Sequence, residues 1–322
     1  MARNITASKR GFGYDPVTRS LGVYVDGALA ASFPPTPGRT YFVNNITGAS
    51  TNDGLSWANA LDQVDNAITA SEAYRDTMSA NNQYIRNQII IQGTATDYEA
   101  VAVSDCSYND FFGIGADPQG DGVGICVISG ANAADAWSAT ATMRGNTWYN
   151  IQFDASGTSY YAFDATTVLR SRWEECAFMG DAGKNEALVA GARFTGSFGG
   201  NTMYRCRVGT NWAEPTTGLR FDGELSNSRI ENCIIEAATN GIYISTDALT
   251  IGGLIKENVI RAATLGIYSA SAQTRLWIVG NWISSADAIS ITAGGTTTGE
   301  HMVLGNHVND AGTVVLFETA AG

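Results

Sequence analysis

The sequence predicts an all-β fold, a right-handed parallel β-helix in which short parallel strands stack into a solenoid. Three observations predict it: a short apolar pattern that recurs along the chain, a composition rich in glycine, and few charged residues. The 322 residues include 36 glycines and only 6 prolines, and 44% are hydrophobic while 16% are charged. This composition suits many tight corners between short strands around a buried core.

The recurring pattern is an apolar residue, two variable residues, a small polar residue or cysteine, one variable residue and a second apolar residue. It reads WYNIQF from residue 148, WEECAF from 173, MYRCRV from 203, IENCII from 230, IKENVI from 255, IVGNWI from 278 and VLGNHV from 303. Successive fourth positions are 25, 30, 27, 25, 23 and 25 residues apart, which predicts one solenoid coil per copy. A second pattern, GLRF at 218–221 and GIYI at 241–244, gives each coil a second short strand.

The fourth position predicts a column of side chains that runs along the solenoid. Its members after the first copy are Cys176, Cys206, Cys233, Asn258, Asn281 and Asn306. We expect this residue at the corner between two strands, where asparagine tolerates the left-handed conformation. Because stacked coils lie about 4.8 Å apart, the asparagines can form an internal hydrogen-bonded ladder. The cysteines are expected to be buried and reduced. With only two histidines in the chain, we expect no metal site and no cofactor.

Two domains are expected. Residues 1–38 predict a basic arm and a small β-hairpin, with a frayed tail as the alternative. The arm carries the basic residues Arg3, Lys9, Arg10 and Arg19, to which we assign a docking role. Residues 39–322 predict the β-helix, which begins with a strand at 41–43 and a capping helix at about 57–76 that covers the open edge of the first coil. Weaker apolar runs between 85 and 147 bring the expected total to about eleven coils.

Carboxylates on adjacent coils could form the acid and base of a glycosidase, which lie roughly 5 to 9.5 Å apart. The weak candidates are Asp222 with Glu224, and Glu231 with Glu236. Glu231 also shares a column with Lys256, so an outward charge ladder that keeps the solenoid soluble is the alternative. The sequence therefore favours a protein that is not an enzyme. An enzymatic role would be that of a polysaccharide hydrolase or lyase.

Aromatic side chains offer a second kind of surface. Tyr243 and Tyr268 have the same outward position on consecutive coils, next to Arg220, and Trp212 is expected to be exposed. A ladder of aromatic rings on a flat β face can stack against sugar rings. The same ladder would serve equally well as an interface between subunits.

The charge and hydropathy of the chain exclude two classes of partner. The net charge is −12, and nucleic-acid binding requires clustered lysine and arginine. We therefore expect no nucleic-acid partner, and no apolar stretch is long enough to predict a membrane span. The N-terminus lacks the apolar core of a signal peptide, so we expect folding in a cytoplasm.

The strand at 41–43, the polar loop Asn52-Asp53-Gly54, the Ser56-Trp57 pair and the helix that follows resemble the N-terminus of pectin-lyase-like β-helix proteins. The whole organisation resembles the spike and decoration proteins of tailed bacteriophages. That resemblance implies a homotrimer of the virion, folded in the host cytoplasm and attached to capsid or tail proteins through its N-terminal arm. It implies a structural spike or capsid decoration protein that contacts bacterial surface polysaccharide. A tailspike that cleaves host polysaccharide and a cellular polysaccharide lyase or hydrolase are the alternatives.

Overall fold

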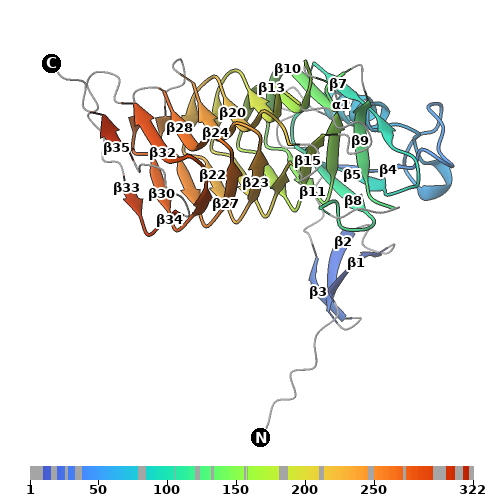
Figure 1. Cartoon of the computed structure of the whole chain (residues 1–322). Helices are drawn as coiled ribbons and strands as arrows, with labels where there is room; N and C mark the ends of the chain where they lie inside the picture. Colours follow the sequence, from blue (N-terminus) through green and yellow to red (C-terminus); the bar gives the residue numbers. More distant parts are fainter. Residues whose placement is uncertain are drawn as a thin grey trace, which may run out of the picture.

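The computed structural model describes residues 38–78, 85–104, 106–119, 124–131, 134–155, 157, 159–180, 188–209, 214–245, 250–270, 273–292 and 302–308. It also describes the backbone of four further strands, β1 (Arg10–Asp15), β2 (Ser20–Val25), β3 (Ala28–Ser32) and β35 (Val315–Glu318). The chain winds into a long rod of stacked parallel strands, with residues near 40–78 at one end and β33 and β35 at the other (Figure 1). This confirms the predicted parallel β-helix.

Three parallel sheets run along the rod, whereas the sequence predicted two strands per coil. Sheet 1 consists of β4 (Thr40–Val43), β5 (Asn87–Gln92), β8 (Asn109–Ile114), β11 (Thr147–Tyr149), β14 (Arg172–Glu174), β18 (Thr202–Tyr204), β22 (Arg229–Glu231), β26 (Leu254–Lys256), β30 (Trp277–Val279) and β33 (Met302–Leu304). Sheet 2 consists of β6 (Tyr98–Glu99), β9 (Val127–Ala131), β12 (Gln152–Ala155), β15 (Ala177–Gly180), β19 (Arg207–Val208), β23 (Ile234–Ala237), β27 (Val259–Ala262), β31 (Trp282–Ser284) and β34 (His307–Val308). The ten strands of sheet 1 give ten levels in the described residues, one fewer than the eleven coils expected.

Sheet 3 divides into two parallel stacks along its length. Its first strands are β7 (Val101–Val103), β10 (Trp137–Arg144) and β13 (Tyr161–Leu169). One stack continues with β16 (Ala190–Phe194), β20 (Thr217–Phe221), β24 (Asn240–Ile244), β28 (Leu265–Ser269), β32 (Asp287–Thr292) and β35, and the other with β17 (Phe198–Gly199), β21 (Leu225–Ser226), β25 (Thr250–Ile251) and β29 (Gln273–Thr274). The long strand β13 pairs with both β16 and β17, so each later coil bends once within this sheet.

The two apolar positions of the repeat form the core of the rod. The first position stacks in register along sheet 1 through Trp148, Trp173, Met203, Ile230, Ile255 and Ile278, all of them buried. The second stacks in sheet 2 through Phe153, Phe178, Val208, Ile235, Ile260 and Ile283. Aromatic rings fill the earlier coils, where Trp148 and Trp173 stack with centroids 4.7 Å apart, and isoleucines fill the later ones. Pairing equivalent residues on every coil fixes the register because a slip would expose a whole apolar column.

The repeat places its fourth residue differently from the expectation. The left-handed conformation belongs to the residue before it, with φ between 52° and 56° at Asn150, Glu175, Arg205, Asn232 and Glu257. The fourth residue therefore points into the rod. There Asn258 donates its backbone N–H to Asn281 Oδ1 at 3.0 Å, and Asn281 donates its own to Asn306 Oδ1 at 2.9 Å. The thiols in the same column donate to backbone carbonyls, as Cys176 does to Trp148 O at 3.4 Å, and all five cysteines are free and buried.

A second internal ladder lies at the corner between sheet 3 and sheet 1, and the sequence analysis missed it. Its members are asparagines and serines: Asn109, Asn146, Ser171, Asn201 and Ser228. The backbone N–H of each of the first four donates to the side chain one coil further on, for example Ser171 N to Asn201 Oδ1 at 2.7 Å. The buried corners of the rod are therefore satisfied by side chains, as buried backbone groups require.

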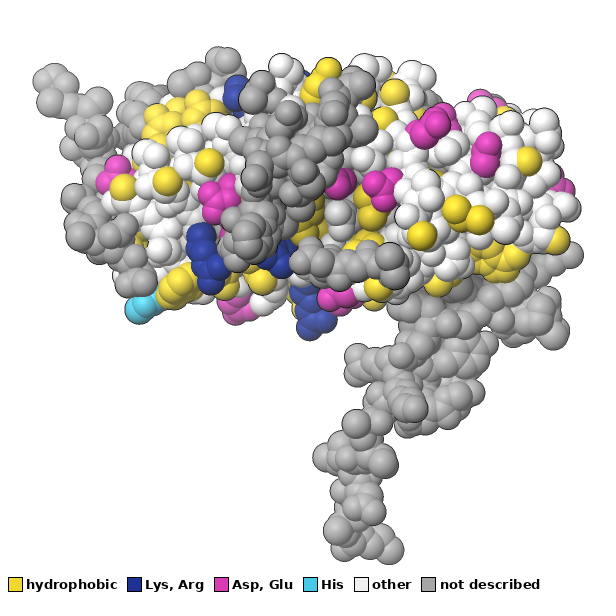
Figure 2. Space-filling view, turned by 45° about the vertical axis from the view of Figure 1, so that its right-hand side comes forward, with side chains coloured by type: hydrophobic (Ala, Val, Ile, Leu, Met, Phe, Trp, Pro, Cys, Tyr) yellow, Lys and Arg dark blue, Asp and Glu magenta, His cyan; other side chains and the backbone are white. Residues whose placement is uncertain are grey.

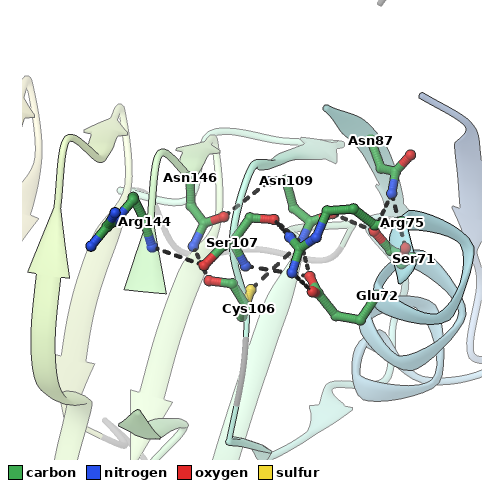
Figure 3. Close-up of polar contacts among 9 residues, drawn as sticks. All are labelled: Ser71, Glu72, Arg75, Asn87, Cys106, Ser107, Asn109, Arg144 and Asn146. Atoms are coloured by element: carbon green, nitrogen blue, oxygen red, sulfur yellow. Dashed lines mark hydrogen bonds and ion pairs between the residues drawn. The ribbon is translucent and has the colours of Figure 1, made fainter. Parts of the chain in front are cut away.

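The first coil is capped by two helical segments where the sequence predicted one helix at 57–76. The 3₁₀-helix η1 (Trp57–Asn59) begins at Ser56, whose side chain accepts from Asn59 N, and α1 (Val64–Met78) follows. The buried Val64, Ala67 and Ile68 of α1 pack into the core. The polar side of α1 joins the second ladder: Arg75 pairs with Glu72 and bonds Ser107 O, and Ser71 bonds Asn109 (Figure 3). α1 therefore covers the open end of the rod with both apolar and polar contacts.

Ahead of the rod, β1, β2 and β3 form a small antiparallel sheet. Strands β2 and β3 correspond to the expected hairpin. Strand β1 begins at Arg10, which the sequence analysis assigned to an irregular arm, so the small sheet has one more strand than predicted. Arg3, Lys9 and Arg19 lie outside the described residues.

Candidate functional site

An outward-facing column of five side chains crosses sheet 3 on consecutive strands from β13 to β28. Its paired members are Asp164, Arg193, Arg220, Tyr243 and Tyr268, which we call the outer column. Each is half-buried, whereas its neighbours on either side in the strand are buried. This follows from the alternation of side chains along a strand, which leaves the third sheet one face for the core and one for solvent.

The first half of the outer column is an ion pair built around Arg193. Its guanidinium donates to Asp164 through two parallel hydrogen bonds, Nε to Oδ1 at 2.9 Å and Nη2 to Oδ2 at 2.7 Å. The third arm, Nη1, donates to the Tyr161 hydroxyl at 2.7 Å, and the guanidinium carbon lies 4.0 Å from the centroid of the Tyr161 ring. A forked pair of this kind fixes both side chains in one geometry.

Asp135 adds a carboxyl with altered acidity beside this pair. Burial raises the pKa of the Asp135 carboxyl, and the negative charge of Asp164 raises that pKa further. A hydrogen bond from Tyr161 N to Asp135 Oδ1 at 2.8 Å and the positive Arg193 oppose the shift. A carboxyl with a raised pKa next to a carboxylate is an arrangement found at acid–base sites.

The second half of the outer column is aromatic. The rings of Tyr243 and Tyr268 lie with centroids 5.4 Å apart and planes tilted by 36°. The guanidinium carbon of Arg220 lies 5.7 Å from the Tyr243 ring centroid, and its Nε donates to the Asp222 carboxylate at 2.8 and 3.1 Å. The two rings and the guanidinium form a half-exposed platform on which a sugar ring can stack.

The carboxylates that the sequence proposed as catalytic have partners of their own or lie on different sheets. Asp222 is held by Arg220, and the Glu224 carboxylate lies 3.5 Å from the Ser197 hydroxyl. Glu231 lies on the outside of sheet 1 in register with Lys256, whereas Glu236 lies in sheet 2. The structure does not bring Glu231 and Glu236 together, because the corner at residues 232–233 separates their strands.

Glu236 instead forms a buried ion pair with two arginines. Its side chain is 2% exposed, and its two oxygens accept from Arg207 at 3.2 Å and from Arg261 at 2.7 Å. Arg207 also donates to Gln119 O at 3.1 Å, which ties the segment around residue 119 to sheet 2. A carboxylate fully engaged by two arginines serves to join coils and not to react with a ligand.

One expected contact residue lies outside the described part of the chain. Trp212 belongs to the residues that are not described. Within the described ranges, no group of three or more His, Cys, Asp or Glu side chains is arranged to hold a metal ion. In the same part of the chain, no helix has the length and apolar character needed to cross a membrane.

Sequence reasoning missed Asp135, Tyr161, Asp164 and Arg193. The signal available was positional, because Asp164, Arg193 and Arg220 have equivalent positions on strands that stack in register. Recognising it requires knowing that β13 and β16 pair across an interval of 29 residues between Asp164 and Arg193.

A family model and a solved structure are similar to this chain. No curated protein has a significant sequence match to this chain. Among solved structures, a tailspike protein, gp49, from the Acinetobacter baumannii bacteriophage Fri1, a capsular polysaccharide depolymerase, is similar over 98% of this chain and 74% of its own, with 8% identity and a TM-score of 0.40. A likeness at this level does not transfer activity, substrate or assembly. The family model of the right-handed β-helix region matches residues 107–308, and the chain therefore belongs to the right-handed β-helix family.

Proposed function

We propose that this chain is a β-helical surface protein of a bacteriophage virion, a spike or decoration protein whose lateral face binds glycans of the host surface. The observation that carries the glycan-binding role is the aromatic half of the outer column, Tyr243 and Tyr268 with Arg220 beside them. Aromatic rings side by side on a flat, rigid sheet suit the stacking of successive sugar rings. The rigidity matters because a preformed surface loses little entropy when it binds.

The virion role is supported by the organisation of the chain. A small antiparallel sheet, β1 to β3, precedes a rod whose first coil is capped by α1. In the proposal this N-terminal part, with Arg3, Lys9, Arg10 and Arg19, docks on an acidic surface of capsid or tail proteins, and the protein is a homotrimer. Mass spectrometry and immunogold labelling of purified phage would place the protein on the particle. Particles that still carry the protein after deletion of residues 1–20 would refute the docking arm.

The glycan-binding role is tested with immobilised bacterial polysaccharides. Wild-type protein should be retained by at least one of them, and a Tyr243→Ala/Tyr268→Ala variant should lose about thirtyfold in affinity, because each of the two stacked rings contributes about 1 kcal/mol. Tyr204→Ala is the matched control, since Tyr204 is a half-exposed tyrosine of sheet 1. Equal retention of all three proteins would refute the site.

The alternative role of the same surface, a contact between subunits, gives a different result. Light scattering after size-exclusion chromatography measures the oligomeric state of the wild type and of the double tyrosine variant. If the variant dissociates and the wild type does not, the two tyrosines belong to a subunit interface.

A second candidate, a spike that also cleaves the glycan it binds, is favoured by Asp135. A general acid needs a carboxyl whose pKa is raised, and burial provides this at Asp135 next to the Asp164 carboxylate. Release of reducing ends from a retained polysaccharide, abolished by Asp135→Asn, would establish cleavage. Absence of reducing ends and of unsaturated sugars after prolonged incubation would rule it out for that polysaccharide.

A further inference from the structure

A ridge of residues with left-handed backbone conformation runs along the corner between sheet 3 and sheet 1. Its members on successive coils are Gly145, Arg170, Gly200, Asn227, Gly252 and Arg275, with φ between 47° and 76°. Strand pairing keeps these residues in one column. The residues that immediately precede Arg170, Gly200, Asn227 and Gly252 pair in register on successive strands: Leu169, Gly199, Ser226 and Ile251. Glycine therefore alternates with a long side chain along the ridge.

This alternation leaves two hollows, one at each glycine that lies between longer side chains. The first, about 460 Å³, lies at Gly200 and is lined by Arg144, Arg170 and Asn227, among others. The second, about 350 Å³, lies at Gly252 and is lined by Asn227, Ser228, Arg229, Ile251, Leu254, Arg275 and Trp277. Asn227 borders both hollows, so they lie next to each other, and we call the two together the arginine groove.

The arginine groove is cationic and carries no internal counter-charge. Arg144, Arg170, Arg229 and Arg275 are all exposed, and no carboxylate lines either hollow. None of the four forms an ion pair with an acidic side chain of the described residues. Most other arginines of the described residues are matched: Arg172, Arg193, Arg205, Arg207, Arg220 and Arg261 all pair with carboxylates.

Four unmatched arginines in one groove contrast with the rest of the chain, whose net charge is −12. Figure 2 shows acidic side chains spread from one end of the rod to the other on the face in view. Guanidinium groups that no protein carboxylate neutralises are available to pair with carboxylate, sulfate or phosphate groups of a ligand. The groove is therefore suited to a ligand that is itself anionic.

The second hollow also has an apolar side. Trp277 is 45% exposed and Ile251 38% exposed, and Leu254 lies next to Trp277 in the register of sheet 1. An exposed indole beside two arginines matches a ligand with a flat, partly apolar ring and an anionic substituent. A sugar acid has both features.

The two hollows repeat along the rod. Gly200 and Gly252 are separated by two coils, which corresponds to about 10 Å at the usual spacing of parallel strands. A polymer with regularly spaced anionic groups can place one group in each hollow, and the second contact then forms at a high effective concentration. A small acidic metabolite would gain nothing from this repetition.

We propose that the arginine groove binds an acidic polysaccharide, with sugar carboxylates or equivalent anionic substituents held by Arg144 and Arg170 in one hollow and by Arg229 and Arg275 in the other. This inference rests on the proposed glycan-binding function and specifies the chemical class of the glycan. Nucleic acid is the less suitable anionic polymer, because its binding depends on a broad positive field that a chain of net charge −12 does not provide.

The test measures the affinity of the full chain for polygalacturonate, alginate, hyaluronate and polysialate, each alongside its carboxyl-reduced, neutral form. At least one acidic polymer should bind, its reduced form about tenfold or more weakly, and affinity should fall with added salt. Arg229→Gln/Arg275→Gln and Arg144→Gln/Arg170→Gln should each weaken binding about tenfold. Arg172→Gln is the matched control, because Arg172 is an exposed arginine in the same column as Arg229 that lines neither hollow and pairs with Glu174.

A variant that fills one hollow distinguishes the contribution of the hollow's shape to binding from the contribution of its arginine charges. Asparagine tolerates the left-handed conformation, and a Cβ at Gly252 would lie 2.9 Å from Asn227 Oδ1, the movable end of a side chain. Gly252→Asn should therefore fold and reduce the affinity for the acidic polymer while leaving all arginines in place. Circular dichroism and the thermal midpoint establish that each variant is folded.

Three results would overturn the inference. They are the absence of binding to every acidic polymer, equal binding of acidic and neutral forms, and unchanged binding by both double arginine variants. Arginine-dependent binding of single-stranded DNA in preference to all the polysaccharides would assign the groove to nucleic acid. Binding of a neutral polymer that depends on Tyr243 and Tyr268 but not on the arginines would preserve the proposed function and refute this inference alone.

Discussion

Replacing Asn281 with alanine removes the central member of the asparagine ladder. Asn281 is 1% exposed, and its Oδ1 accepts from the backbone N–H of Asn258 at 3.0 Å and from Asn258 Nδ2 at 2.9 Å. Its Nδ2 donates to Ile255 O at 3.0 Å and to Asn306 Oδ1 at 2.9 Å. The alanine variant leaves the buried Asn258 N–H without its acceptor and takes a donor from Ile255 O.

The expected loss of stability follows from these two buried groups. A buried polar group that loses its partner costs about 1–3 kcal/mol, so we expect Asn281→Ala to lower the free energy of unfolding by about 2–4 kcal/mol. Asn306→Ala is the matched control. Asn306 makes equivalent contacts one coil further on but is partly exposed, so water can replace them and the loss should be about 1 kcal/mol.

Urea unfolding followed by tryptophan fluorescence measures both losses, and hydrogen exchange locates them. Because each coil of a solenoid contacts only its neighbours, loss of protection should concentrate in β26, β30 and β31 and spare the coils around β11. A stability of Asn281→Ala within 0.5 kcal/mol of wild type, or equal losses for the two variants, would contradict the ladder as a source of stability.

Three further predictions concern buried charged and titratable groups. Glu236→Ala should lower stability by about 2 kcal/mol and more than Glu236→Gln does, because alanine leaves Arg207 and Arg261 with no acceptor whereas glutamine keeps one acceptor oxygen; equal chemical denaturation midpoints would contradict this. Burial raises the pKa of Asp135 above its value in the unfolded chain. The neutral carboxyl therefore makes its full contribution to stability below about pH 3.9, and this contribution is lost as the pH rises through the pKa of Asp135 in the folded protein. Asp135→Asn should therefore melt at the same temperature as wild type at pH 3 and at a higher temperature at pH 7, and the reverse order would refute the shift. Burial raises the pKa of the Cys126, Cys176 and Cys233 thiols, so a disulfide reagent at pH 8 should titrate none of these three until the protein unfolds; rapid reaction of any of them in the native state would refute their burial.

The fold was predictable because equivalent positions of the sequence repeat stack on one another in successive coils. Each copy carries two apolar positions, and a side chain such as Ile255 can be buried on every coil only if the copies lie in register. The same periodicity identifies which residues share a column but not which of two adjacent residues faces inward. For that reason the left-handed conformation was expected at Asn258 and belongs to Glu257.

The second ladder and the arginine groove could not be predicted, because no periodic apolar pattern marks their residues. Members of the second ladder, such as Asn201 and Ser228, lie between polar residues and vary in type, so no apolar flank marks them. The groove brings together Arg144, Arg170, Arg229 and Arg275 from four coils at unequal sequence spacings. Only the observed pairing of strands shows that a glycine lies between longer side chains on the ridge.

The outer column was half predicted. Tyr243, Tyr268 and Arg220 belong to strands with a recognisable pattern, and the structure gives them the shared outward position expected from the sequence. Asp164 and Arg193 belong to strands whose sequences differ from that pattern, so their ion pair emerged only from the fold.

The central claim is that a lateral face of the rod binds a glycan. A crystal structure of the protein with an oligosaccharide from a retained polysaccharide tests it most directly. We predict a sugar ring stacked on Tyr243 and Tyr268 within reach of Arg220. A saccharide bound only outside both the outer column and the arginine groove, or the two tyrosines buried against a second subunit in the crystallised assembly, would contradict the claim.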